Sequence, residues 1–253
     1  SHMFWRTLDA PGPHAGVIRD FYRHLDDALG RAVEALRIEA GSDVTLIVMS
    51  DHGFAPFRRT VHLNSWLREQ GFLSLRGDKP AGRELFGDVD WSRTRAYGLG
   101  LNGLYLNQQG RERFGVVAGG ERDRLLAEIG AKLLAWRDPR TAEPVVTRVY
   151  RREEIYGSRY RDLAPDLVIG YSRGYRVSDA SALGEAPRAT IEDNPKKWSG
   201  DHCMAAELVP GVLLSNRPIE SAGPGLADLA PTILALFGVA PPAEMAGQPV
   251  LSH

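Results

Sequence analysis

The chain has 253 residues, a net charge of −1 at pH 7, 43% hydrophobic residues and 25% charged residues. This composition can bury a sizeable core, which excludes a disordered chain. The charge argues against a nucleic-acid polymer as partner, because such binding usually needs a basic face. The single cysteine excludes an internal disulfide, and no apolar run reaches the length of a membrane span. We therefore expect one α/β domain over 1–253 with no membrane partner, located in the cytoplasm because no signal peptide precedes the fold.

The first half of the chain alternates helical and strand-like patterns. Apolar residues spaced by three and four predict an amphipathic helix over 16–38. The apolar, β-branched run over 44–49 then predicts a strand that is covered on both faces. A helix joined to a strand by a short loop is the α/β unit that a parallel sheet requires. Asn64 and Gly71 predict the two ends of a short helix.

Glycine and proline mark two loop insertions, one near 76–95 and one near 172–200. The second insertion is long enough to be functional or mobile, and it leads directly to His202. A strand over 212–215 and a helix capped by Asp228 complete the chain. The remaining core elements are predicted as a strand at 97–107, a helix at 121–137, and strands at 145–150 and 164–171.

An adjacent carboxylate and imidazole follow the predicted strand 44–49, in the stretch Ser50-Asp51-His52-Gly53-Phe54. Open α/β sheets place ligand and metal chemistry at the carboxyl ends of their strands. An ionised aspartate and a neutral histidine suit Zn²⁺, and Mn²⁺ less well. The same pair also occurs in ordinary turns, where Asp51 would cap backbone amides and His52 would be solvated.

A second cluster of possible ligands stands near the other end of the chain, in Trp198-Ser-Gly-Asp-His-Cys203. His202 comes from a loop that feeds the predicted strand 212–215. Asp201 and Cys203 flank it, and all three side chains can bind a metal. Taken alone, His202 fits a loop histidine satisfied by its surroundings equally well.

Three other features have structural interpretations. We interpret His62 as a packing residue, because no partner shares its spacing with the Asp51-His52 pair. Arginine pairs such as Arg58 and Arg59 stand among acidic residues, which is typical of a solvated surface. We interpret Cys203 as a buried structural cysteine.

The combination and order of these stretches resemble the type I phosphodiesterase/nucleotide pyrophosphatase branch of the alkaline phosphatase superfamily. The resemblance is densest at 44–73 and 191–250 and thin at 75–165. It implies an α/β fold whose mixed, mostly parallel sheet is sandwiched by helices, truncated at its N-terminus in this chain. The stretches that carry the resemblance are Ser50-Asp-His-Gly-Phe54, Gly200-Asp-His202, Val209-Pro-Gly-Val-Leu213, the run from Asp228 to Gly238, and Met245-Ala-Gly-Gln-Pro-Val250.

The resemblance further implies a metal-dependent hydrolase of small phosphorylated substrates that holds two divalent metals, usually zinc. One site of the family takes an early Asp, a Thr or Ser nucleophile, and an Asp-His pair, which corresponds to Asp51 and His52. The other takes an Asp-x-x-x-His stretch and a late His, which corresponds to His202. In such sites two metals clamp an in-line displacement at phosphorus.

The resemblance is incomplete at the start of the chain. The early Asp and the nucleophile of the family would fall before residue 1, so the nucleophile is absent. His2 stands where the family has the histidine of Asp-x-x-x-His. Ser1-His2-Met3 is also what a cleavable tag leaves ahead of a native Met3. A truncated gene, a mis-assigned start codon and a deliberately expressed fragment all remain open.

Three hypotheses follow for the chain. It is a metal-dependent phosphodiesterase with an incomplete site, weak or inactive in isolation, or it is a non-catalytic fold remnant or a metal- or metabolite-binding module. Alternatively, it is a fragment that folds through homo-oligomerisation, because losing a central strand exposes an edge that must be covered. The first hypothesis expects Asp51, His52 and His202 to converge at one edge of the sheet.

Overall fold

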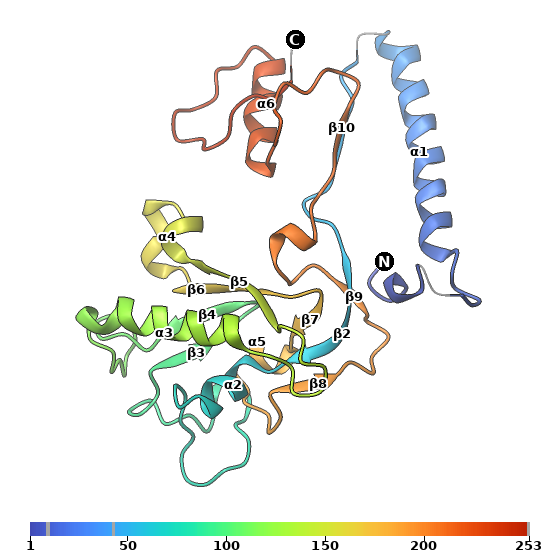
Figure 1. Cartoon of the computed structure of the whole chain (residues 1–253). Helices are drawn as coiled ribbons and strands as arrows, with labels where there is room; N and C mark the ends of the chain where they lie inside the picture. Colours follow the sequence, from blue (N-terminus) through green and yellow to red (C-terminus); the bar gives the residue numbers. More distant parts are fainter. Residues whose placement is uncertain (9–10, 42–43, 252–253) are drawn as a thin grey trace. The chain divides into compact units, whose positions relative to one another are not determined.

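The computed structural model describes residues 1–8, 11–41 and 44–251 (Figure 1). By its internal contacts the chain divides into two compact units. Unit 1 comprises Ser1–Ala15 and Phe54–Val209, and unit 2 comprises Gly16–Gly53 and Pro210–His253. Each unit is described by itself, and the expectation of one domain over 1–253 stays a prediction.

The first sheet of unit 1 has four antiparallel strands in the order β3-β4-β6-β5. Helix α3 (Arg122–Ala135) packs on β5, and its Leu125, Leu126, Ile129 and Leu133 are buried in the core (Figure 1). The helix thus presents one apolar side to the sheet, as the spacing over 121–137 predicts. The strands are β3 (Ala96–Gly98), β4 (Gly103–Leu106), β5 (Val146–Arg151) and β6 (Leu167–Tyr171).

The second sheet of unit 1 is built on the central strand β2. Strand β2 pairs in parallel with β7 and antiparallel with both β8 and β9. Alternate residues of β2 are buried, and His62 alone separates the last of them, Val61, from helix α2. The strands are β2 (Ala55–Val61), β7 (Gly174–Val177), β8 (Ile191–Asp193) and β9 (Gly200–Asp201), and the adjoining helices are α2 (Leu63–Glu69) and α5 (Asp179–Ala182).

Short helical turns connect these elements within unit 1. They are η1 (Trp5–Thr7), η2 (Glu84–Phe86), η3 (Gly119–Glu121), α4 (Arg152–Ile155), η4 (Ser158–Leu163) and η5 (Ala206–Leu208). Turn η2 lies inside the predicted insertion 76–95. Asp88 is buried there and binds both Lys79 and Arg83, so the insertion is anchored by ion pairs.

Unit 2 contains helix α1 (Val17–Ala40), strands β1 (Ile47–Met49) and β10 (Leu213–Ser215), turn η6 (Leu226–Asp228) and helix α6 (Leu229–Leu236). Strands β1 and β10 form a two-stranded antiparallel sheet. Helix α6 begins after Asp228, as predicted, and the Asp228 carboxylate also accepts a hydrogen bond from the Gln248 amide at 2.8 Å. The closing segment is therefore tied to the start of α6.

Helix α1 confirms the predicted helix over 16–38, but its apolar side is largely exposed. Of its residues, Ile18 is buried. The side chains left exposed are Phe21, Tyr22, Leu25, Leu36 and Ile38. Such an apolar face is stabilised only when something covers it. The expected association between copies of the chain stays a prediction.

Several sequence expectations differ from the structure. Met49 is 40% exposed in β1, so the prediction of a strand covered on both faces is wrong. Strand β10 is the one described neighbour of β1 in its sheet. The chain is an α/β protein, but most of its described strand pairs are antiparallel. Strands β2 and β7 pair in parallel. Strands β3 and β4 are joined by a short turn, which permits antiparallel pairing only, because parallel pairing needs a long crossover.

Two local expectations also change. The stretch 172–200 contains β7, α5 and β8, each too short to produce a readable period. Asn64 lies inside α2 instead of capping it, because the helix begins at Leu63. The Asn64 side chain accepts a hydrogen bond from the Gly98 amide at 2.7 Å and donates one to its carbonyl at 3.0 Å, which joins α2 to β3. No helix within the described ranges is long and apolar enough to cross a bilayer.

A buried carboxylate, Asp166, links the first sheet to the segments beside it. It accepts hydrogen bonds from the Leu106 amide at 2.9 Å, Arg111 at 2.6 Å and Arg122 at 3.2 Å. Arg152 lies 3.6 Å away. Three guanidinium groups therefore share one carboxylate that is shielded from water, and each of them also pairs with a second carboxylate nearer the surface, Glu112 or Glu153.

We expect Asp166→Ala to lower the free energy of unfolding by about 1.5–3 kcal/mol, because it removes the buried, charge-assisted hydrogen bonds that Arg111 and Arg122 donate to this carboxylate. Urea unfolding followed by circular dichroism measures the loss. Asp162→Ala is the matched control, since Asp162 is 96% exposed and lies 3.7 Å from Arg152. Equal, small effects of the two substitutions would contradict the role given to Asp166.

Candidate metal centre

The four predicted metal ligands fall into two pairs. His2 and His202 belong to unit 1, and Asp51 and His52 belong to unit 2. The geometry of each pair is described within its own unit. The expected meeting of both pairs around common metals stays a prediction.

The two histidines of unit 1 lie side by side although 200 positions separate them. Their ring centroids are 6.2 Å apart. Phe54 contacts both rings edge-on, at 4.7 Å from His2 and 5.9 Å from His202. The fold therefore brings together two residues that the sequence could associate only through the family resemblance.

Backbone carbonyl contact fixes the ring of His2. Its Nδ1 lies 2.7 Å from the Gly200 carbonyl oxygen, and its ring stacks on Trp198 at 3.8 Å. A carbonyl oxygen can only accept, so Nδ1 carries the proton and Nε2 keeps its lone pair. Gly200 must be glycine, because a Cβ there would lie 2.3 Å from the Cβ of Trp5. Metal-binding histidines are commonly oriented by such a bond from their other nitrogen.

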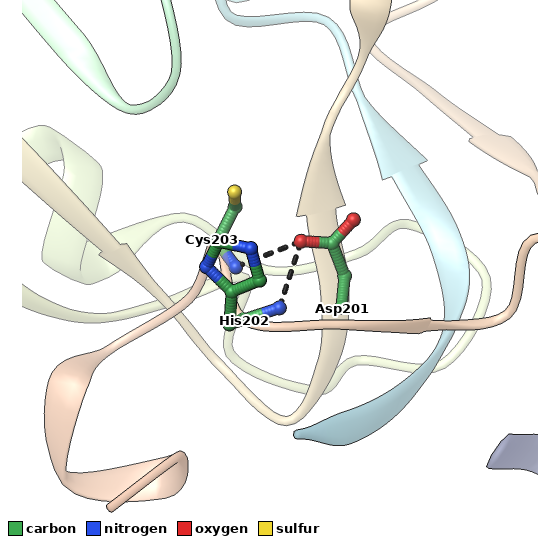
Figure 2. Close-up of side chains that lie close together, drawn as sticks. All are labelled: Asp201, His202 and Cys203. Atoms are coloured by element: carbon green, nitrogen blue, oxygen red, sulfur yellow. Dashed lines mark hydrogen bonds between the residues drawn. The ribbon is translucent and has the colours of Figure 1, made fainter. Parts of the chain in front are cut away.

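Asp201, His202 and Cys203 form a tight group of metal-binding side-chain types, with their ligand atoms within 4.8 Å of one another (Figure 2). The Asp201 carboxylate is buried and already engaged. One oxygen accepts the amides of His202 at 2.7 Å and Cys203 at 3.0 Å, the two dashed bonds of Figure 2. The other accepts Arg176 at 2.6 Å and the Trp198 indole N–H at 2.9 Å. Asp201 thus shapes the loop that presents His202.

The electrostatics of this loop favour a charged Asp201 and a neutral Cys203. Burial by itself would raise the pKa of Asp201, but the bonds from Trp198, Arg176 and the Cys203 amide outweigh it and hold that pKa well below its usual range. Burial, together with the negative charge of Asp201, raises the pKa of the Cys203 thiol to about 12. A protonated thiol is a poor metal ligand, because the thiolate is the binding form.

In unit 2 the predicted pair follows β1, as expected. His52 Nε2 lies 3.4 Å from an oxygen of Asp51, and His52 Nδ1 lies 2.9 Å from the Gly53 carbonyl oxygen. The other Asp51 oxygen accepts the His52 amide at 3.1 Å. As in His2, the carbonyl contact directs Nδ1 to a backbone oxygen, while Nε2 of His52 faces the Asp51 carboxylate.

A cavity of about 650 Å³ shares Trp198 with the histidine pair of unit 1, although neither histidine is among its lining residues. Trp198 and Arg176 line it and also hold Asp201. His62 lies in its wall, with Nδ1 2.8 Å from the Ser178 hydroxyl and Nε2 3.3 Å from Glu192. His62 is buried, and its interpretation as a packing residue stays a prediction.

A model of the type I phosphodiesterase/nucleotide pyrophosphatase family matches residues 2–200. The chain belongs to this family. No curated protein matches the sequence. Among solved structures, human ectonucleotide pyrophosphatase/phosphodiesterase 5 is similar in fold, with a TM-score of 0.50 and 15% identity over 100% of this chain and 62% of that chain. The murine protein of the same name gives a TM-score of 0.41 and 17% identity over 90% of this chain and 51% of that chain.

These comparisons confirm the family resemblance and the α/β fold. The chain spans less than two thirds of the human protein that it matches. Sequence reasoning missed Arg176 and Phe54 as neighbours of His202. Trp198 stood in the quoted stretch, but Arg176 lies in β7, a strand too short to give a readable pattern in the sequence.

We expect Cys203 to react slowly with a disulfide reagent such as Ellman's reagent in the native chain at pH 8. Its pKa lies far above this pH, so the reactive thiolate is scarce, and rates should be on the order of 100-fold below those of the unfolded chain. Absorbance at 412 nm follows the reaction, and the sequence contains no other cysteine to confuse it. A full burst from folded protein would contradict a buried, protonated thiol.

Proposed function

We propose that this chain forms part of the two-metal site of a hydrolase that acts on phosphate esters. His2 and His202 would belong to one metal position, and Asp51 and His52 to the other. The observation that carries the proposal is the contact between His2 and His202, whose rings lie 6.2 Å apart across 200 positions of sequence. Membership of the phosphodiesterase family supports it.

The donor chemistry fits divalent metals, with zinc favoured and manganese possible. His2 and His52 each direct Nδ1 to a carbonyl oxygen, which leaves Nε2 as the donor nitrogen. Neutral imidazole and carboxylate are ligands that Zn²⁺ accepts readily. Asp201 and Cys203 fit less well, because one is fully hydrogen-bonded and the other is protonated. Bound divalent ions would neutralise a phosphoryl group and activate the attacking oxygen.

The chain's own residues would orient the ligands and receive the substrate. Asp201 positions His202 through two backbone amides, while Trp198 packs against His2. The adjoining cavity of about 650 Å³ is large enough for the organic part of a small phosphorylated substrate. Its wall combines the aromatic Trp198 with charged side chains of both signs, and Arg176 there is paired with Asp179 and Asp201.

We further propose that the family's Thr or Ser nucleophile is not among residues 1–253. No matching strand and nucleophile stand before Asp51 in this sequence. Without it the covalent route to phosphodiester cleavage is lost. The chain by itself would then bind metal while turning over a phosphodiester slowly or not at all.

We expect His202→Ala and His2→Ala each to weaken Zn²⁺ binding by at least about 10- to 100-fold, the loss typical of disturbing a metal site. Competition with a chromogenic zinc chelator, with metal content measured by mass spectrometry, gives the affinity and stoichiometry. His24→Ala is the control, because His24 lies on the exposed surface of α1. Unchanged zinc binding by His202→Ala would refute the proposed site.

Turnover separates the hydrolase from a binding module. We expect hydrolysis of bis-p-nitrophenyl phosphate by zinc-loaded chain to be near the uncatalysed background, because the nucleophile is missing. Turnover is followed at 405 nm in the wild type and in Asp51→Ala. Robust activity that Asp51→Ala abolishes would overturn the missing nucleophile and support a complete site. Zinc binding without turnover is the expected result.

A further inference from the structure

A second cavity of unit 1, of about 560 Å³, is lined by arginines from three segments. Arg58 and Arg59 come from β2, Arg140 from the turn after α3, and Arg173 from the turn between β6 and β7. The volume falls within the roughly 300–1,000 Å³ of small-molecule sites. The sequence interpretation treated the Arg58-Arg59 pair as solvated surface, and the fold places both residues with Arg140 and Arg173 on the lining of one cavity.

Two of the four guanidinium groups are neutralised within the protein. Arg59 binds the buried Asp138 through two nitrogens, at 2.8 and 3.1 Å. Asp193 then accepts Arg59 and Arg140, each at 2.6 Å. These ion pairs fix one side of the cavity, because a guanidinium held on both edges cannot rotate away.

The other two guanidinium groups, of Arg58 and Arg173, make no ion pair or side-chain hydrogen bond among the described residues. Both side chains are exposed, so a dissolved ligand can reach them. Glu143 is the remaining carboxylate on the lining. The cavity therefore carries unpaired positive charge, although the chain as a whole has a net charge of −1.

Hydrogen bonds within the protein also hold Tyr175, which forms part of the cavity wall. The Tyr175 hydroxyl donates to Asp138 at 3.1 Å and lies 3.2 Å from the Thr141 hydroxyl. Tyr175 is buried, so its ring forms a rigid wall. A preformed wall lowers the ordering cost that binding must meet.

We propose that this cavity binds a small molecule carrying two or more phosphate groups, with Arg58 and Arg173 as its main charge partners. Guanidinium groups recognise phosphate oxygens through paired, charge-assisted hydrogen bonds. Two unpaired arginines on separate segments suit two anionic groups better than one. The proposal does not rest on metal binding at His2 and His202.

The test is titration calorimetry of metal-free protein with inorganic pyrophosphate, and with inorganic phosphate for comparison. Metal-free protein is used so that a metal centre cannot capture the anion. We expect one pyrophosphate per chain, bound more tightly than phosphate. Arg58→Ala/Arg173→Ala should weaken binding about tenfold or more, since each arginine would supply charge-assisted bonds. Glu143→Gln should tighten it a few-fold by removing a like charge.

Arg19→Ala/Arg93→Ala is the control, because it removes the same charge from exposed positions outside the cavity. It should leave pyrophosphate affinity within about twofold of the wild type, the range of a weak, screened surface effect. Thermal unfolding of each variant verifies its fold. The proposal is overturned if wild type binds no pyrophosphate, if both double variants weaken binding equally, or if Glu143→Gln has no effect. Loss of zinc binding in the histidine variants would leave this result unchanged.

Discussion

The loop that carries His202 depends on one buried, negatively charged carboxylate. Asp201 is shielded from water, yet four donors compensate its charge: two backbone amides, Arg176 and the indole of Trp198. Because these contacts hold its pKa below the usual range, Asp201 stays charged through neutral pH. The stabilisation it supplies is present above the ordinary aspartate pKa and is lost as the pH falls through the lowered one. The histidine beside it is placed by this network and by the aromatic contacts of Phe54.

Backbone carbonyl oxygens orient the rings of two candidate ligands, His2 and His52. His2 and His52 lie in different units, yet both direct Nδ1 to a carbonyl oxygen of a glycine. Such contacts fix tautomer and ring orientation without using a side-chain carboxylate. For His2 the arrangement also requires Gly200, where a larger residue would collide with Trp5. Gly200 is therefore required by close packing against Trp5 and not by chain flexibility.

Charge is distributed unevenly over unit 1. Asp166 collects three arginines in the interior, whereas Asp138 and Asp193 together hold two at the edge of a cavity. Asp193 borders both cavities, the one beside the histidines and the one lined by arginines. Because Asp193 is part of β8, this short strand borders both cavities.

The sequence by itself determined the family, the α/β class, the helix α1, the start of α6 and the identity of the Asp51-His52 and His202 motifs. These depend on local periodicity, capping residues and short contiguous stretches, which a single sequence displays directly. Tertiary structure alone decided the antiparallel pairing, the contact of His2 with His202, the contact of Arg176 with Asp201, and the position of Arg173 on the lining of a cavity. Those features join residues far apart along the chain, and no local pattern encodes which distant strand or loop will lie beside them. Strands as short as β7 and β8 exist because neighbours pair with them, so their formation is settled by packing.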